Sequence, residues 1–189
     1  MNTPAHLVVG MAAFGRPGRP IVILAALVGA LLPDLSLYVL SGWHLLVLGT
    51  SAETVFRELY YSDAWQAVFA VDNSIPLWAL ALVVGLAFGW TWLTAGAGAG
   101  LLHLATDFFL HHDDARRHLW PLSDWVFVSP VSYWDGAHYG DIVGPLETLL
   151  VLVLCAWTWT RLRAPGWRVL IVLLGLAQLA PMLVWRLMF

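Results

Sequence analysis

The sequence predicts an all-α membrane protein, a multi-pass helical bundle of about five spans plus a short N-terminal helix. Of its 189 residues, 60% are hydrophobic and only 11% are charged, whereas a soluble domain carries about 25% charged residues. The apolar residues come in long runs of the length that a bilayer requires, and polar residues gather between them. Nothing divides the chain into parts, so residues 1–189 are expected to form a single integral membrane domain.

The rest of the composition excludes several function classes. The net charge of −3 gives no reason to expect a nucleic-acid partner. The single cysteine, Cys155, lies in an apolar run, so a CxxC redox motif and a cysteine zinc cluster are both excluded. No serine-hydrolase elbow, phosphate loop or dinucleotide fingerprint is present. The partner that composition does predict is the lipid bilayer.

The helices are placed in order by their boundary signals. Thr3-Pro4 is typical of a helix start with threonine as N-cap. The helix that follows, to about Phe14, is shorter than the roughly 17–25 residues that cross a bilayer. After a breaker loop at 15–20, apolar runs predict the five spans, at 21–40, 75–93, 100–112, 145–160 and 169–189.

Polar loops are expected at 50–73 and 113–144. Arginines at 15–20 and at 161–168 mark those two loops as cytoplasmic under the positive-inside rule. The two polar loops then lie on the non-cytoplasmic side. Between the second and third spans, the sequence TAGAGAG at 94–100 fits either a tight hairpin or a close helix contact.

One stretch, Gly100–Asp114 (GLLHLATDFFLHHDD), carries most of the candidate chemistry. On a continuous helix, His103, Asp107, His111 and Asp114 fall within roughly 80° of one another. Ionisable residues inside an apolar segment are costly, which makes them functional-site candidates by default. The predicted topology brings this face, Asp34 of the first span and the start of the N-terminal helix to one depth in the outer half of the membrane.

This convergence predicts a metal centre. Imidazoles and carboxylates without thiolates fit a divalent metal, Zn²⁺ or Mn²⁺ before Fe. The candidate ligands are His6, Asp34, His103, Asp107 and His112, and the candidate catalytic residues are His111 and Asp114, as general base or further ligand. In the alternative interpretation each polar group is satisfied separately: His6 at the interface, Asp34 by an arginine, and 111–114 as a solvated helix end.

The chain resembles the YdjM-like inner-membrane family, described as metal-dependent hydrolases. The matching pieces are Thr3-Pro4-Ala5-His6, Leu32-Pro33-Asp34, Leu102-His103 with Asp107, and Leu119-Trp120-Pro121-Leu122-Ser123. The resemblance covers about the first two-thirds of the chain, and it implies a bacterial inner-membrane hydrolase whose metal ligands include His6, Asp34, His103 and Asp107. Two departures are Ser36, where the family tends to carry an acid, and Asp72-Asn73-Ser74, where it tends to carry a histidine element.

Two functions are therefore weighed. The first is a membrane-embedded metal-dependent hydrolase acting on a lipid-like or phosphoester substrate. The second is a non-catalytic membrane protein, such as a metal or proton transporter or an assembly factor with a degenerate metal site. Similar chains have also been labelled cobalamin-biosynthesis proteins, but this sequence has no phosphate loop, and Cys155 is not placed as a nucleophile.

Overall fold

The computed structural model describes residues 1–188 of the chain, with side chains described for residues 1–180. All regular structure in this range is helical. Four helical stretches are long and apolar enough to cross a membrane, Pro20–Val47, Asp63–Ala87, Thr91–Leu110 and Gly140–Arg161. The last helix, α8 (Pro165–Met188), begins before the predicted residue 169, and Phe189 lies outside the described residues. The predicted fold class is confirmed.

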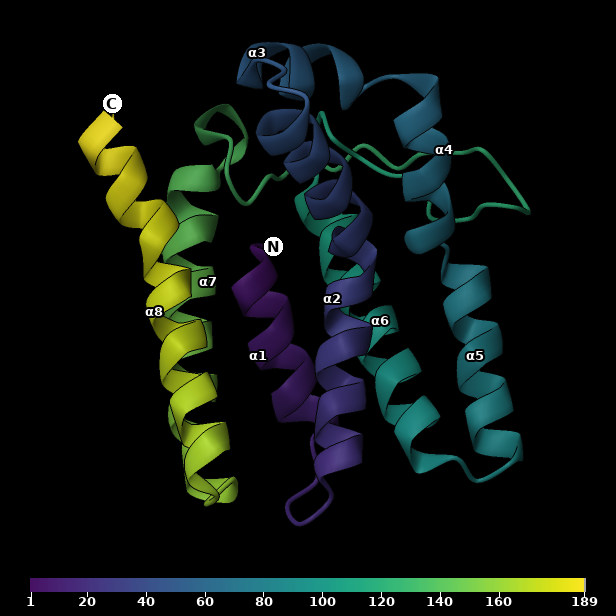
Figure 1. Ribbon diagram of the computed structural model, residues 1–189, viewed down its shortest axis with the longest axis vertical. Helices are drawn as coiled ribbons and strands as arrows, with labels where there is room; N and C mark the ends of the chain where they lie inside the picture. Colours follow the sequence, from purple (N-terminus) through teal and green to yellow (C-terminus); the bar gives the residue numbers. More distant parts are fainter. Residues whose placement is uncertain (189) are drawn as a thin grey trace.

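The short helix α1 (Thr3–Phe14) lies in the middle of the bundle, between α2 (Pro20–Gly42) and α6 (Thr91–Leu110) on one side and α7 (Gly140–Arg161) and α8 on the other (Figure 1). Ala5 and Val8 of α1 are fully buried. Asn2, not Thr3, occupies the N-cap position, and Thr3 is the first helical residue. Because α1 is surrounded by other helices, a polar side chain on it faces protein and not lipid.

The small residues at 94–100 lie inside α6, where they allow a close helix contact. A Cβ atom on Gly29 of α2 would lie 2.6 Å from the carbonyl carbon of Gly96, so the two backbones touch. The turn between the spans comes earlier, after α5 (Ile75–Ala87), with Gly89 at φ 66. The predicted span 75–93 is therefore wrong at its C-terminal end, because Gly89 supplies the left-handed residue that ends a helix there.

The predicted polar loop at 50–73 is wrong as well, because this segment is mostly helical. It contains α3 (Ala52–Thr54), a π-helical turn at Val55–Leu59 and α4 (Asp63–Asp72). Aromatic residues among the charged ones pack into an apolar cluster, which stabilises these helices; its buried members are Val55, Tyr60, Trp65 and Phe69. Helix α2 likewise runs on as a π-helical turn at Trp43–Val47.

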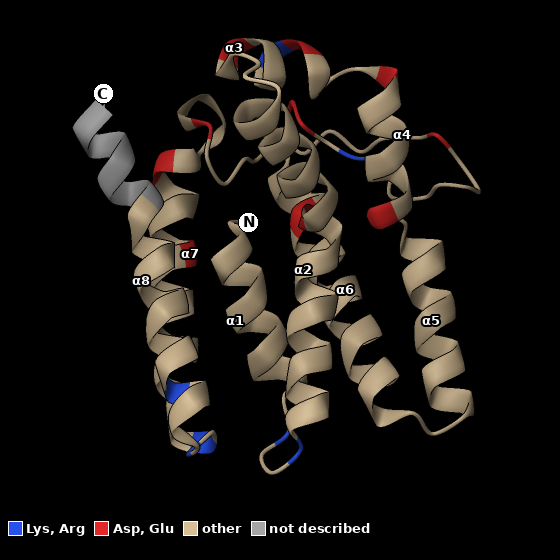
Figure 2. Ribbon diagram, in the orientation of Figure 1, with Lys and Arg blue, Asp and Glu red and all other residues tan. Residues whose placement is uncertain are grey.

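The two ends of the bundle differ in charge. We call the end formed by residues 43–74 and 111–140 the acidic end, and the end formed by residues 15–20, 88–90 and 162–164 the basic end. Figure 2 shows the acidic residues on and near the acidic end, and arginines at the basic end. Most of 111–139 is irregular, with a short 3₁₀ turn at Gly136–His138, before α7 begins at Gly140. Both polar segments thus lie at one end, as predicted; which side of the membrane they face remains a prediction.

Candidate metal centre

Three helices place the predicted ligands together just inside the acidic end. His6 comes from α1, Asp34 from α2, and His103 and Asp107 from α6. Residues four apart on a helix share a face, which brings His103 and Asp107 together without any tertiary requirement. His6 joins them because α1 packs on both α2 and α6.

His6, His103 and Asp107 form the core of this site, which we call the His-His-Asp group. Nε2 of His6 lies 2.9 Å from Oδ1 of Asp107, and Nε2 of His103 lies 3.0 Å from Oδ2. The two imidazole rings are stacked with their centroids 3.5 Å apart. All three side chains are buried, and their ligand-type atoms lie within 4.8 Å of one another. The group could therefore hold a metal ion.

The second nitrogen of each histidine has a partner that sets its tautomer. Nδ1 of His103 lies 2.7 Å from the carbonyl oxygen of Ala30, to which only a protonated nitrogen can donate. Nδ1 of His6 lies 3.4 Å from the hydroxyl of Thr106, which itself donates to a backbone carbonyl and so accepts from His6. In the neutral form of each ring, Nε2 then carries the lone pair that metal ligation requires.

Both Nε2 atoms face the carboxylate oxygens of Asp107. Both Nε2 atoms are buried and neither makes a hydrogen bond of acceptable direction, despite the short distances to Asp107. The amino group of Met1 donates to Oδ1 of Asp107 at 2.6 Å and forms a buried ion pair with it. The Met1 amino group thus compensates the charge of Asp107, whereas the two Nε2 atoms lack a hydrogen-bond partner, which is costly in a buried site and which a metal ion or a proton would relieve.

Asp34 lies at the edge of the group. Its Oδ1 is 3.7 Å from Nε2 of His103, and its Oδ2 accepts a hydrogen bond from the hydroxyl of Thr3. The Thr3 hydroxyl is also 2.7 Å from the phenol oxygen of Tyr38. Among the described residues no arginine pairs with Asp34, so the alternative of a separately satisfied ion pair does not apply to it.

His111 and Asp114 form a dyad beside the group. Nδ1 of His111 lies 2.8 Å from Oδ2 of Asp114, and its Nε2 lies 3.4 Å from Oδ1 of Asp107. Burial alone would lower the pKa of His111, but the two carboxylates outweigh burial and raise the pKa to about 9. An imidazolium held between two carboxylates in this way can give up a proton at Nε2.

The structure does not bring His112 to the other candidate ligands. Its Nδ1 lies 2.6 Å from the carbonyl oxygen of Ser129, and its ring stacks on His138, with 3.5 Å between the centroids. The reason is the end of α6 at Leu110: His111 is already extended, with φ −114 and ψ 124. The assumption of a continuous helix to residue 112 is wrong, and with it the single helix face that would carry His111 and Asp114.

A cavity of about 120 Å³ adjoins the group on the side of the acidic end. Besides the candidate site residues Asp34, Asp107, His111 and Asp114, its lining includes Tyr60, Tyr133, Asn73 and Arg116. The sequence alone predicts neither Tyr60 nor Tyr133 at this cavity. Tyr133 is placed by the fold of the irregular segment, for which the sequence carries no periodic signal, and Tyr60 directly follows the π-helical turn at Val55–Leu59.

Two contacts from α7 hold α1 in place, and neither was foreseen. Near the group, Oε1 of Glu147 accepts from the backbone nitrogen and the side-chain amide of Asn2, at 3.0 and 2.8 Å. The amide of Gln178 donates to the same oxygen at 2.8 Å. At the basic end, Arg161 donates to the carbonyl oxygens of Ala12 and Gly15, at 3.0 and 3.4 Å.

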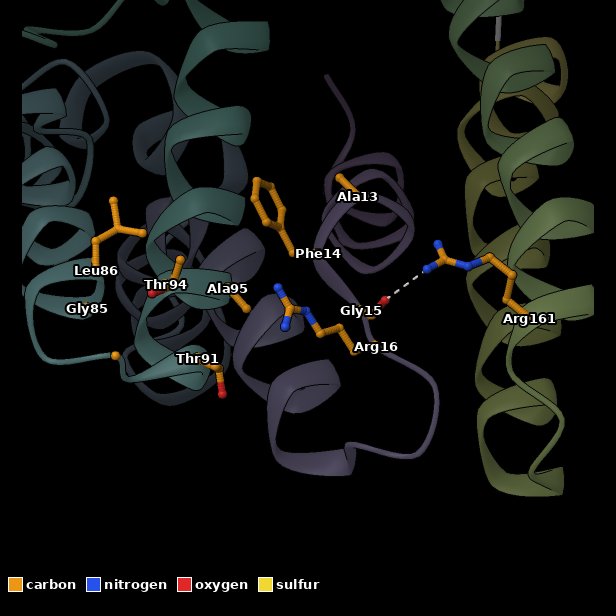
Figure 3. A pocket seen from close by; sticks show the side chains of 11 residues that line it. Ala13, Phe14, Gly15, Arg16, Gly85, Leu86, Thr91, Thr94, Ala95 and Arg161 are labelled. Carbon is orange, nitrogen blue, oxygen red and sulfur yellow. Dashed lines mark hydrogen bonds between the residues drawn. The ribbon is translucent and has the colours of Figure 1, made fainter.

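A larger cavity of about 340 Å³ lies at the basic end (Figure 3). Arg16 extends into it from the loop after α1, whereas the guanidinium of Arg161 is turned to Gly15 (Figure 3). Its lining contains no histidine, cysteine or carboxylate. This cavity therefore offers no chemistry to compare with that of the His-His-Asp group.

Comparisons with protein-family models, with curated proteins and with solved structures gave no match to this chain.

Proposed function

We propose that this protein is a metal-dependent hydrolase embedded in the bacterial inner membrane, a divergent relative of the YdjM-like family, acting on a lipid-like or phosphoester substrate. His6, His103 and Asp107 would hold the metal, with Asp34 as a further ligand. Zn²⁺ or Mn²⁺ fits two imidazoles and one or two carboxylates better than Mg²⁺ does.

One observation carries the proposal: two buried imidazole lone pairs converge on one buried carboxylate. His6 and His103 each approach Asp107 within 3.0 Å, without hydrogen-bond geometry. The Nδ1 atom of each imidazole is hydrogen-bonded to an oxygen, and such a hydrogen bond orients metal-ligating histidines. The amino group of Met1 pairs with Asp107 at 2.6 Å, but the two buried Nε2 atoms have no hydrogen-bond partner, and leaving them so in an apolar bundle is costly unless a metal ion binds them.

The His111–Asp114 dyad would supply proton transfer. A divalent cation at the His-His-Asp group would polarise the substrate and lower the pKa of a nearby water toward about 7. The water oxygen bonds to the phosphorus or carbonyl carbon, and the bond to the leaving oxygen breaks. His111 gives the leaving oxygen its Nε2 proton and regains one from the water, while Asp114 holds the ring through Nδ1.

The distribution of ionisable residues favours a hydrolase over a transporter. Transport needs access from both ends of the bundle, and a proton path needs groups along it. Among the described residues, Asp and Glu lie on and toward the acidic end (Figure 2), and the 340 Å³ cavity at the basic end is lined by no histidine or carboxylate. A site reached from one end, within a membrane protein, suits a substrate that arrives from the bilayer or its surface.

The first experiment measures metal content by mass spectrometry on detergent-purified protein. Wild type is compared with Asp107→Asn and with Asp124→Asn, whose carboxylate is 81% exposed on the irregular segment. We expect near-stoichiometric Zn²⁺ or Mn²⁺ in wild type and in Asp124→Asn, and loss in Asp107→Asn. Negligible metal in all three, after incubation with both ions, would contradict the proposal.

The second experiment tests hydrolysis. Metal-loaded wild type and His111→Gln are assayed against short-chain phospholipids and p-nitrophenyl phosphoesters. We expect turnover in wild type and a loss of about 10²–10⁴-fold in His111→Gln, the usual share of general acid–base catalysis, with metal content retained. Bound metal without turnover of any ester would favour the non-catalytic alternative, a transporter or an assembly factor.

A further inference from the structure

Arg116 is a buried cation in the wall of the cavity beside the His-His-Asp group. It is 9% exposed and lies on the irregular segment after α6. Its guanidinium carbon lies 4.8 Å from the ring centre of Tyr60 and 4.4 Å from that of Phe69. Nη2 donates to the Tyr60 hydroxyl at 2.6 Å. These contacts fix the position of the guanidinium.

The other terminal nitrogen of Arg116 has no partner. Nη1 is buried and makes no hydrogen bond within the described part of the chain. No carboxylate oxygen of the described residues lies within 4.0 Å of a guanidinium nitrogen of Arg116. A guanidinium is always charged in proteins. Against the effect of burial, His111 and Arg116 lower the pKa of Asp114, but no carboxylate lies within ion-pair distance of the Arg116 guanidinium, so Nη1 can bond a further anion.

The cavity that Arg116 lines has room for such an anion. Its volume of about 120 Å³ greatly exceeds the roughly 10–15 Å³ that one water needs. Asp107 of the His-His-Asp group lines the same cavity. A tetrahedral oxyanion has several oxygens, so one of them can bond Arg116 while another faces the metal position.

The nearby carboxylates do not prevent an anion from binding there. Asp114 is paired with His111 at 2.8 Å, and Asp107 is paired with the amino group of Met1 at 2.6 Å. Asp34 is engaged by the hydroxyl of Thr3. Of the described cationic side chains that line this cavity, His111 is paired with a carboxylate and Arg116 is not.

We propose that Arg116 binds the phosphate group of the substrate, through Nη1, and so selects phosphoesters over carboxylic esters. This inference rests on the proposed function, because the bound phosphate belongs to a substrate only if the protein is a hydrolase. The binding of a phosphate-type oxyanion can nevertheless be tested without any turnover. The anion comes either from a lipid headgroup or from a soluble phosphate compound.

The test is phosphate binding to full-length protein in detergent. Inorganic phosphate is titrated into wild type, Arg116→Gln, Arg116→Lys and Arg117→Gln, with binding followed by calorimetry and by the shift in melting temperature. Arg117 is the matched control, because it is the next residue and bonds exposed Asp124 at 3.4 Å. The melting temperature without phosphate, together with metal content, establishes that each variant is folded.

We expect phosphate to bind about tenfold to a hundredfold more weakly to Arg116→Gln, as for loss of one hydrogen bond to a charged group. Arg117→Gln should bind as wild type, and Arg116→Lys should retain part of the affinity. Equal phosphate affinity in folded Arg116→Gln and wild type would overturn the inference. So would the absence of phosphate binding to wild type that holds its metal.

The same samples separate this inference from the proposed function. Wild type without metal would contradict the hydrolase, whereas phosphate binding that depends on Arg116 would still support the anion site. Repeating the titration with short-chain phosphatidic acid and with glycerol phosphate distinguishes the sources. Tighter binding of the lipid, lost in Arg116→Gln, identifies a headgroup; equal binding of both identifies a soluble phosphate compound.

Discussion

Replacing Gly29 with alanine should disturb the metal site from a distance, through the contact between α2 and α6. The new Cβ would lie 2.6 Å from the carbonyl carbon and 2.8 Å from the Cα of Gly96, and closer still to its carbonyl oxygen. Ordinary contact begins at 3.4 Å, so the two backbones must separate by at least about 0.8 Å. No rotamer change relieves this clash, because both partners are backbone.

The displacement reaches the histidine through the adjacent residue. The carbonyl oxygen of Ala30 is 2.7 Å from Nδ1 of His103, and a shift of this size lengthens the contact to about 3.5 Å, beyond hydrogen-bond length. Loss of such a supporting contact typically weakens metal binding about 10–100-fold. Overpacking should also cost about 1–3 kcal/mol of folding free energy.

Gly42→Ala is the matched control, since it lies in the same helix and a Cβ there meets nothing within 4 Å. Its stability should stay the same or rise by about 0.5–1 kcal/mol, the usual gain from replacing a helical glycine. Zn²⁺ affinity is measured by competition with a chromophoric chelator, and stability by thermal unfolding in detergent. If both variants match wild type in Zn²⁺ affinity, then α2 does not support His103 in the way described.

Three further predictions concern individual side chains. Thr106→Val keeps the shape but removes the oxygen that accepts from His6, so Zn²⁺ affinity in the chelator assay should fall about 10–100-fold; unchanged affinity would mean that His6 is oriented otherwise. Asn73→Ala removes hydrogen bonds to the carbonyl oxygens of Pro33 and Phe69, and thermal unfolding should show a loss of about 1–3 kcal/mol, whereas a loss near zero would mean that water replaces both bonds. In metal-free protein, folding raises the pKa of His111 from 6.5 to about 9. The contribution of His111 to the free energy of unfolding is therefore full below pH 6.5 and disappears as the pH rises through about 9. The melting temperature of wild type should therefore fall over that interval more steeply than that of His111→Gln, and parallel curves would contradict the His111 assignment.

The parts of the site that could be predicted are those that a single helix determines. His103 and Asp107 lie four residues apart, and helical periodicity alone puts them on one face. The approach of His6 and Asp34 followed from the cost of burying polar groups at a common depth. Both inferences rest on local spacing or on the membrane, and neither needs tertiary detail.

The parts that failed depend on where helices end and on how irregular chain folds back. Because α6 ends at Leu110, His112 lies against Ser129 and away from the other candidate ligands. The sequence at 111–114 contains no glycine or proline that would predict this helix end. Charges at 50–73 suggested a loop, yet Tyr60, Trp65 and Phe69 pack into a cluster that stabilises helices there. The burial of Arg116 between Tyr60 and Phe69 depends on tertiary packing, so the sequence does not predict it.

The contacts of α7 with both ends of α1 bear on how much of the chain a working site requires. Glu147 accepts hydrogen bonds from Asn2, and Arg161 donates to the carbonyl oxygens of Ala12 and Gly15. Helix α7, which contributes no metal ligand, therefore fixes the position of α1 along its axis and with it the depth of His6 in the bundle. The recognisable motifs all precede residue 124. A fragment that ends after these motifs would keep every candidate ligand but lose α7, and with it the contacts that hold His6 beside His103 and Asp107.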